Sequence, residues 1–239
     1  PKCLGCHAPD SLQASGVGKE PAVRDNVQDS GVDCVGCHQD ADEAIHGAQG
    51  LNSQDHKVIK DQKLGTVEMC ASCHTKYGTV DEFKASTHAA EPKACAQCHM
   101  PEVERPIAED GPKRKGHLHT FRAKDNPDLL KDRLVLDASV AGGKIVVKLT
   151  SKDIGHKVPT GYDTKQVLIE VTLGDLKKTA ILTKNGDQGD TRLAPGATFT
   201  LEVPAEGKKG KATVRVLHKA APDVPDEDVK VLLTAEVEV

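Results

Sequence analysis

"GVDCVGCHQDADEAIH", residues 31–46, contains two cysteines three positions apart and a histidine directly after the second. The same spacing recurs in "CLGCH", "CASCH" and "CAQCH", so that all eight cysteines of the 239-residue chain belong to such pairs. The pairs consist of Cys3, Cys6, Cys34, Cys37, Cys70, Cys73, Cys95 and Cys98, and the histidines that follow them are His7, His38, His74 and His99. No thiol is left over, which indicates one chemical task repeated along the chain.

Two thiols at this spacing can add to the two vinyl groups on one edge of a haem. The next residue then lies under the ring with its imidazole at the iron. The sequence therefore predicts four covalently attached haems c, each with its proximal histidine. Zinc ribbons or disulfides are the alternative, because Cys-x-x-Cys pairs also form tetrahedral zinc sites. A zinc ribbon has no need of a histidine after every pair, so the pattern favours haem.

The composition agrees with large prosthetic groups and excludes some functions. Aromatic residues make up 2% of the chain and tryptophan is missing, so the rings that usually fill a core are scarce. Buried haem would replace them, at roughly 25 cal/mol per Å² of apolar surface. A formal charge of −4 with interspersed signs gives little support to nucleic-acid binding. No apolar run approaches the roughly 20 residues of a membrane span.

Histidine is the best candidate for the sixth ligand of each iron. Met69 and Met100 adjoin attachment motifs and are badly placed to cross the plane of the same haem. Of the eleven histidines, four are proximal, which leaves seven for four irons and favours bis-histidine ligation with lower reduction potentials than His/Met pairing. The predicted distal ligands are His46, His88, His119, His156 and His117, with His56 competing with His117 and His156 for the fourth place. His218 falls in a predicted strand and stands outside this set.

The spacing of the two histidines in "KGHLHTF", residues 115–121, restricts which irons they can bind. Residues two apart face the same side of an extended segment and nearly opposite sides of a helix, so His117 and His119 do not easily serve one iron. We expect them to serve two haems, with His117 available to a haem of a neighbouring subunit.

The second half of the chain has a different period. Apolar residues alternate in segments that end near Leu149, Leu173, Val203, Val216 and Val237, with "AGGK" and "APGAT" as turns between them. The expected fold class is a mainly irregular and α-helical, haem-packed N-terminal domain, residues 1–128, followed by an all-β immunoglobulin-like sandwich, residues 129–239. "DIGHKVPTGYD", residues 153–163, is expected to be a rigid loop that presents His156 to a haem at the domain junction.

The attachment motifs, together with "FKASTHAAEPKACAQCHMPE", "HTFR" and "GHKVPTG", resemble multihaem cytochromes c of the group that includes the tetrahaem cytochrome of nitrification. A tetrahaem domain joined to a β-sandwich is most similar to the extracellular tetrahaem cytochromes that polymerise into filaments, called cytochrome nanowires. The resemblance implies electron transfer and no enzymatic activity, through stacked bis-histidine haems that run from one subunit into the next. It also implies a homopolymer in which a distal histidine can come from the neighbour, with separate redox partners.

Two other functions remain open at this point. The first is a monomeric periplasmic tetrahaem electron shuttle. The second is a multihaem enzyme that converts nitrogen oxides or hydroxylamine, which needs a five-coordinate iron. Covalent haem is attached outside the cytoplasmic membrane, so we expect an extracellular or cell-surface location, or alternatively the periplasm. The start at Pro1 suggests a processed form.

Overall fold

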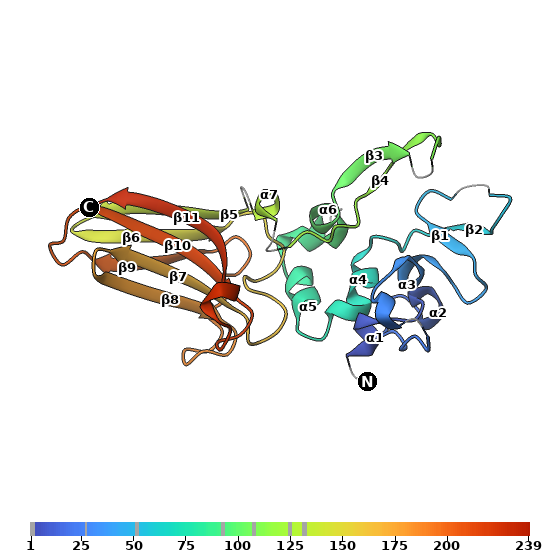
Figure 1. The fold of residues 1–239 in the computed structure, drawn as a ribbon, viewed down its shortest axis with the longest axis horizontal. Coiled ribbons are helices and arrows are strands. Elements are labelled where there is room, and N and C mark those ends of the chain that lie inside the picture. Colours follow the sequence, from blue (N-terminus) through green and yellow to red (C-terminus); the bar gives the residue numbers. More distant parts are fainter. Residues whose placement is uncertain are drawn as a thin grey trace. The chain divides into compact units, whose positions relative to one another are not determined.

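The computed structural model describes residues 3–26, 28–50, 53–91, 94–106, 109–123, 126–130 and 133–239 (Figure 1). The chain groups into two compact units. One comprises Pro1–Asp81 with Glu91–His119, and the other comprises Glu82–Ala90 with Thr120–Val239. We call them the N-terminal unit and the β unit. The predicted division into domains 1–128 and 129–239 stays a prediction, and residues 82–90 and 120–128 are the segments that depart from it.

Short helices carry the four attachment motifs of the N-terminal unit. They are α1 (Leu4–His7), α3 (Cys34–His38), α4 (Val67–His74) and α6 (Cys95–His99), and the unit also contains α2 (Leu12–Ser15), η1 (Gln28–Ser30) and the start of α5 (Thr79–Lys84). One helical turn places residues three and four apart on the same side. Each motif therefore directs its two thiols and its histidine towards one region.

Side chains at the helix starts explain where two of these helices begin. Asp33 caps α3, because its carboxylate accepts a hydrogen bond from the Gly36 N–H at 3.2 Å. Thr66 caps α4 in the same way, through the Met69 N–H at 3.4 Å. These caps satisfy backbone donors that a helix of one or two turns leaves open.

Two small sheets complete the N-terminal unit. Strands β1 (Ile45–Gly47) and β2 (Val58–Lys60) pair in parallel, with His46 opposite Ile59. Strands β3 (Glu102–Pro106) and β4 (Lys113–His117) form an antiparallel hairpin in which Glu102 lies opposite His117. Most residues of the hairpin are exposed.

The predicted fold class is wrong. The structure is 36% strand and 20% helix, and its described residues form four sheets, two of them within residues 45–117. This arrangement differs from the predicted one, which was a mainly irregular and helical, haem-packed N-terminal domain followed by a separate immunoglobulin-like sandwich. The hairpin segments "EVERP" and "KRKGH" were missed for a physical reason. Since both faces of the hairpin meet solvent, the segments lack the apolar alternation that marks a half-buried strand.

Two antiparallel sheets make up most of the β unit (Figure 1). One sheet has the order β11-β10-β7-β8 and the other the order β5-β6-β9. Their bounds are β5 (Leu134–Ala141), β6 (Lys144–Ser151), β7 (Gln166–Leu173), β8 (Leu176–Thr183), β9 (Thr198–Pro204), β10 (Lys211–Lys219) and β11 (Lys230–Glu238). The unit also contains η2 (Thr87–Ala90), α7 (Pro127–Leu130) and η3 (Asp226–Asp228).

The apolar cluster of the β unit comes from alternate residues of both sheets. Its fully buried members include Ile145, Val147, Leu149, Val167, Ile169, Val171, Val214 and Val216. The two-residue period therefore predicted these inward-facing positions correctly. The turn "AGGK" is also confirmed, because Gly142 and Gly143 connect β5 to β6 with positive φ values of 57° and 73°. Such angles suit a two-residue hairpin and favour glycine.

Truncating a side chain of this cluster should destabilise the β unit. Ile169 is 0% exposed, whereas Ile181 on the neighbouring strand β8 is 47% exposed. We expect Ile169→Ala to lower the free energy of unfolding by about 2–5 kcal/mol, and Ile181→Ala to change it by less than about 1 kcal/mol. Urea unfolding followed by far-UV circular dichroism measures both. Equal effects of the two substitutions would contradict the assigned core.

Candidate haem site

None of the eight cysteines forms a disulfide, and cysteines of different motifs approach one another. The Cys6 Sγ lies 4.0 Å from the Cys73 carbonyl oxygen, which connects the first motif to the third. The Cys70 thiol donates a hydrogen bond to the Cys95 sulfur, which connects the third motif to the fourth. That bond lowers the pKa of Cys95 to about 7 and raises the pKa of Cys70. Three of the four attachment points are thus neighbours.

An ion pair between a buried arginine and a half-buried aspartate holds the helix of the second motif. Arg24 is 8% exposed and binds Asp33 through two hydrogen bonds of 2.7 Å, one from each terminal nitrogen. These bonds keep the pKa of the Asp33 carboxyl below its usual value. Because Asp33 also caps α3, its carboxylate connects the start of the second motif to Arg24, which lies nine residues earlier in the chain. The sequence signal was an Asp directly before the first cysteine, a typical N-cap position.

The imidazole of His38 is oriented by a backbone oxygen. Its Nδ1 lies 2.8 Å from the His46 carbonyl, so Nδ1 donates the hydrogen bond. Metal-binding histidines commonly donate one ring N–H in this manner, which fixes the ring and directs the other nitrogen to the metal. His38 therefore has the hydrogen bonding expected of a proximal ligand.

A second imidazole lies beside His38. The ring centroids of His38 and His119 are 5.9 Å apart and the rings are tilted by 56°. The pKa of His119 is lowered, first by burial and then by the proximity of His38. Two predicted ligand residues, 81 positions apart in sequence, are thus brought together within the N-terminal unit.

His117 lies at the end of strand β4 and is exposed. Its Nδ1 lies 2.7 Å from the Met100 carbonyl oxygen, the same kind of bond that orients His38. His117 belongs to the hairpin, whereas His119 lies past the end of the strand. That these two histidines of "KGHLHTF" serve two haems stays a prediction.

His46 is held differently from the other predicted ligands. Its Nδ1 lies 3.0 Å from an Asp61 carboxylate oxygen and its Nε2 lies 3.1 Å from an Asp40 carboxylate oxygen. Both ring nitrogens are therefore bound to carboxylates. Nothing in the sequence distinguished these two acids, because "CHQDADEAIH" and the segment after β2 are rich in charged residues.

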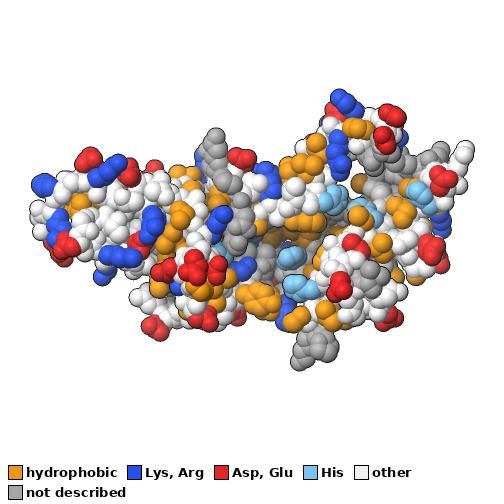
Figure 2. Space-filling model, in the orientation of Figure 1, with side chains coloured by type: hydrophobic (Ala, Val, Ile, Leu, Met, Phe, Trp, Pro, Cys, Tyr) orange, Lys and Arg blue, Asp and Glu red, His pale blue; other side chains and the backbone are white. Residues whose placement is uncertain are grey.

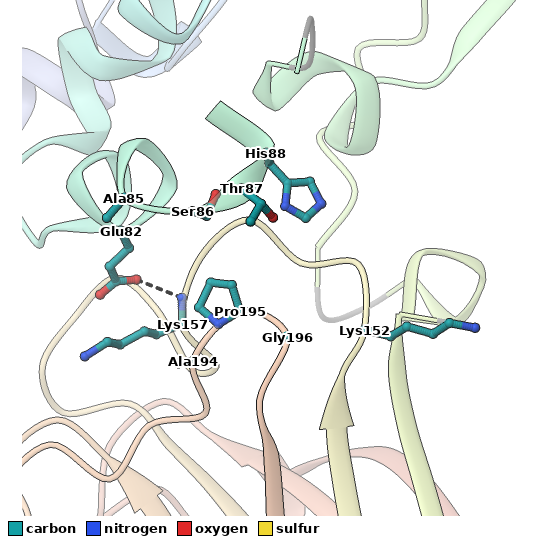
Figure 3. Close-up of a pocket in the computed structure, with 10 residues that line it drawn as sticks. All are labelled: Glu82, Ala85, Ser86, Thr87, His88, Lys152, Lys157, Ala194, Pro195 and Gly196. Carbon is teal, nitrogen blue, oxygen red and sulfur yellow. Dashed lines mark hydrogen bonds between the residues drawn. The ribbon is translucent and has the colours of Figure 1, made fainter. Parts of the chain in front are cut away.

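His88 and His156 both belong to the β unit. The Nε2 of His88 lies 2.7 Å from Asp153, and its buried Nδ1 has no hydrogen-bond partner among the described residues. The Nδ1 of His156 lies 2.9 Å from the Lys157 carbonyl oxygen. His88 lines a hollow of about 400 Å³ whose other side is formed by Glu82 and the loop around Lys157 (Figure 3).

Glu82 connects the segment of His88 to two loops of the β unit. Its carboxylate accepts hydrogen bonds from the Lys157 N–H at 3.1 Å, shown in Figure 3, and from the Thr160 hydroxyl at 2.7 Å. It also forms an ion pair with Arg192 at 2.6 Å, and the two side chains are 10% and 5% exposed. Sequence reasoning missed this residue, since a single glutamate in a short helix has no distinguishing pattern.

The other five histidines lie on separate elements of the chain. His7, His74 and His99 end α1, α4 and α6, directly after their cysteine pairs. His56 is exposed between β1 and β2, and His218 is buried in β10.

The residues of the N-terminal unit fit a large flat group. Its buried apolar residues are mostly small, namely Ala8, Ala44, Ala71 and Ala96 beside Leu12, Met69 and Val80. Figure 2 shows histidine side chains gathered with hydrophobic ones around a hollowed part of this unit. Apolar walls, paired thiols and oriented imidazoles are the donor set of a covalently bound haem. Within the described ranges, no group of His, Cys, Asp and Glu side chains is arranged to hold a metal ion by itself.

Comparisons with known proteins give a likeness in structure. No protein-family model matches the sequence, and no curated protein matches it. The structure resembles that of the penta-haem cytochrome c552 from Thermochromatium tepidum, with a TM-score of 0.59 and 17% sequence identity, over 99% of this chain and 76% of that chain. The chain shares its fold with that cytochrome.

A second match carries no weight. An oxidised superoxide reductase aligns with 44% of this chain and 86% of its own, at 14% identity and a TM-score of only 0.20. None of the described helices has the length and apolar character needed to cross a bilayer.

Removing the Asp33 carboxylate should weaken the second motif. We expect Asp33→Ala to cost about 1–3 kcal/mol, because it deletes a helix cap and leaves the buried Arg24 guanidinium without its partner. Urea unfolding measures the loss, and intact mass spectrometry shows whether a fraction of the protein has one haem fewer. Asp29→Ala, at an exposed position in η1, is the matched control. Full stability in Asp33→Ala would show that the ion pair is not structural.

Proposed function

We propose that this protein transfers electrons through four covalently attached haems c whose irons are ligated by two histidines each. Four Cys-x-x-Cys-His turns supply eight cysteines, none of them in a disulfide, and four proximal imidazoles. The likeness in fold to a penta-haem cytochrome c552 supports the same class of cofactor.

The observation that carries this proposal is the pairing of His38 with His119. Two imidazoles that bind one iron from opposite sides, each at a metal–nitrogen distance of about 2 Å, have ring centres roughly 6 Å apart. The measured separation is 5.9 Å. We therefore assign His119 as the distal partner of His38 for the haem attached at Cys34 and Cys37.

The remaining histidines fit the number of irons. We take His88, His117, His119 and His156 as the four distal ligands, because both ring nitrogens of His46 face carboxylates, whereas in His88 only Nε2 does. Four proximal and four distal histidines occupy both axial positions of four irons. A fully ligated haem supplies a one-electron couple and leaves no iron position for a substrate. This favours electron transfer over the conversion of nitrogen oxides or hydroxylamine.

Short distances between attachment points support an electron path. Cys6 lies next to the third motif, and Cys70 is hydrogen-bonded to Cys95 of the fourth. Haems joined at these thiols would have neighbouring edges. We infer a closely spaced chain of haems in which the first haem lies next to the third and the third lies next to the fourth.

We further propose that the protein works outside the cytoplasmic membrane, at the cell surface or beyond it, as the subunit of a haem-to-haem polymer. The exposed position of His117 on the β3–β4 hairpin supports donation of this ligand to a neighbouring subunit. A monomeric periplasmic shuttle is the competing form. Electron microscopy of the native holoprotein separates the two, because a polymer gives filaments and a shuttle gives isolated particles.

Removing His119 should open one axial position. We expect His119→Ala to convert one of the four haems from low spin to high spin and to let it bind cyanide or carbon monoxide rapidly, with the other three unchanged. Electron paramagnetic resonance and absorption spectra measure this. His56→Ala, at an exposed histidine of the same unit, should keep the wild-type spectrum. Four low-spin haems in His119→Ala would contradict the assignment.

A further inference from the structure

The chain turns back directly after the second attachment motif. Asp40 organises this turn, because its Oδ1 accepts hydrogen bonds from the N–H groups of Asp42 at 3.0 Å and Ala44 at 2.9 Å. Its own N–H donates to the Ala44 carbonyl at 3.1 Å. The turn leads into β1, which begins at Ile45. His46 is thereby brought back to the helix that ends at His38.

The ring of His46 lies between two carboxylates. Its side chain is 12% exposed, and those of Asp40 and Asp61 are 20% and 10% exposed. Asp61 is fixed in turn, since its Oδ1 accepts from the Lys63 N–H at 2.8 Å and its own N–H donates to the Gly47 carbonyl at 2.9 Å. The ring is therefore fastened at both nitrogens to acids that the backbone already holds.

These contacts leave no nitrogen of His46 for iron. Both ring nitrogens face carboxylate oxygens, at 3.0 and 3.1 Å, and the three side chains are no more than 20% exposed. An iron could bind His46 only by displacing one of these two carboxylates.

The backbone of the same residue has a different contact. The His46 carbonyl oxygen accepts the 2.8 Å hydrogen bond from Nδ1 of His38. That oxygen belongs to β1, whose parallel pairing with β2 and whose clamped side chain both restrict its position. One residue is thus anchored by its ring and orients a proximal ligand by its backbone.

We propose that His46 is a positioning residue for the proximal ligand His38, fixed by Asp40 and Asp61, and that it is not an axial ligand. The inference rests on the proposed function, since it takes His38 as a haem ligand. It replaces the earlier prediction of His46 as a distal ligand and gives the two aspartates a role. The His38–carbonyl bond makes the imidazole a stronger donor, which stabilises ferric over ferrous iron and lowers the potential of this haem.

The proposal is tested with His46→Ala in the intact holoprotein. We expect all four haems to remain low spin, because no iron ligand is lost. We also expect one reduction potential to rise in a spectroelectrochemical titration, because β1 no longer holds the carbonyl against His38. Loss of such an outer partner typically changes metal affinity by about 10–100-fold. A tenfold change in the ratio of ferric to ferrous affinity corresponds to about 59 mV for one electron.

Matched variants separate the alternatives. His56→Ala is the control for the loss of a histidine from this unit, and Asp55→Asn, at an exposed acid, is the control for Asp61→Asn. Asp61→Asn should raise the same potential by a smaller amount, since it weakens one of the two clamps. His46→Gln, which keeps one donor, should fall between His46→Ala and the wild type, and it serves if the alanine variant does not fold.

Two results would overturn the inference. A high-spin haem in His46→Ala would make His46 an axial ligand, and unchanged potentials in all His46 and Asp61 variants would remove its positioning role. Neither result bears on whether the wild-type protein contains four low-spin haems. That measurement tests the proposed function by itself, so the two failures can be told apart.

Discussion

A single turn of helix is the unit on which the N-terminal half depends. Cysteines three residues apart, followed by histidine, come to one side of the chain only when the turn is helical. Helices of four to eight residues are marginal in water on their own, because nucleation is unfavourable and few hydrogen bonds follow it. The turns therefore need outside support. The cap and ion pair at Asp33 supply it for the second motif, and the Thr66 cap supplies it for the third.

The sequence was informative where one physical pattern acted alone. In the β unit, burial on one face imposed a two-residue period, and the inward residues of β6, β7 and β10 were found from it. Two glycines with positive φ marked the turn between β5 and β6. The N-terminal half offered no such period. Its two small sheets are short pairs of strands, β1 with β2 and β3 with β4, and the exposed strands of the hairpin have no alternation of apolar residues.

The same difference between local patterns and distant contacts applies to the residues of the haem site. Proximal histidines could be read from the sequence because they are covalently next to their cysteines. Distal partners depend on tertiary contacts, and we propose that His46 is not one of them. Its position eight residues after His38 suggested a ligand that loops back, and the chain does loop back. What the residue meets there is a pair of carboxylates, whose arrangement depends on Asp61 after strand β2. No sequence pattern within the attachment motif predicts the contact between His46 and Asp61.

The β unit is more than a C-terminal addition, because residues 82–90 belong to it while lying between the third and fourth attachment motifs. Glu82 shows why the segment stays there. Its carboxylate is almost fully buried and is satisfied by Arg192, Thr160 and the Lys157 N–H. A buried charge that loses its partners is strongly destabilising, so this segment depends on residues more than 70 positions further along the chain. Cutting the chain between residues 128 and 129 would remove all three partners. The part of the chain with the attachment motifs would then keep Glu82 and His88 without the contacts that order them.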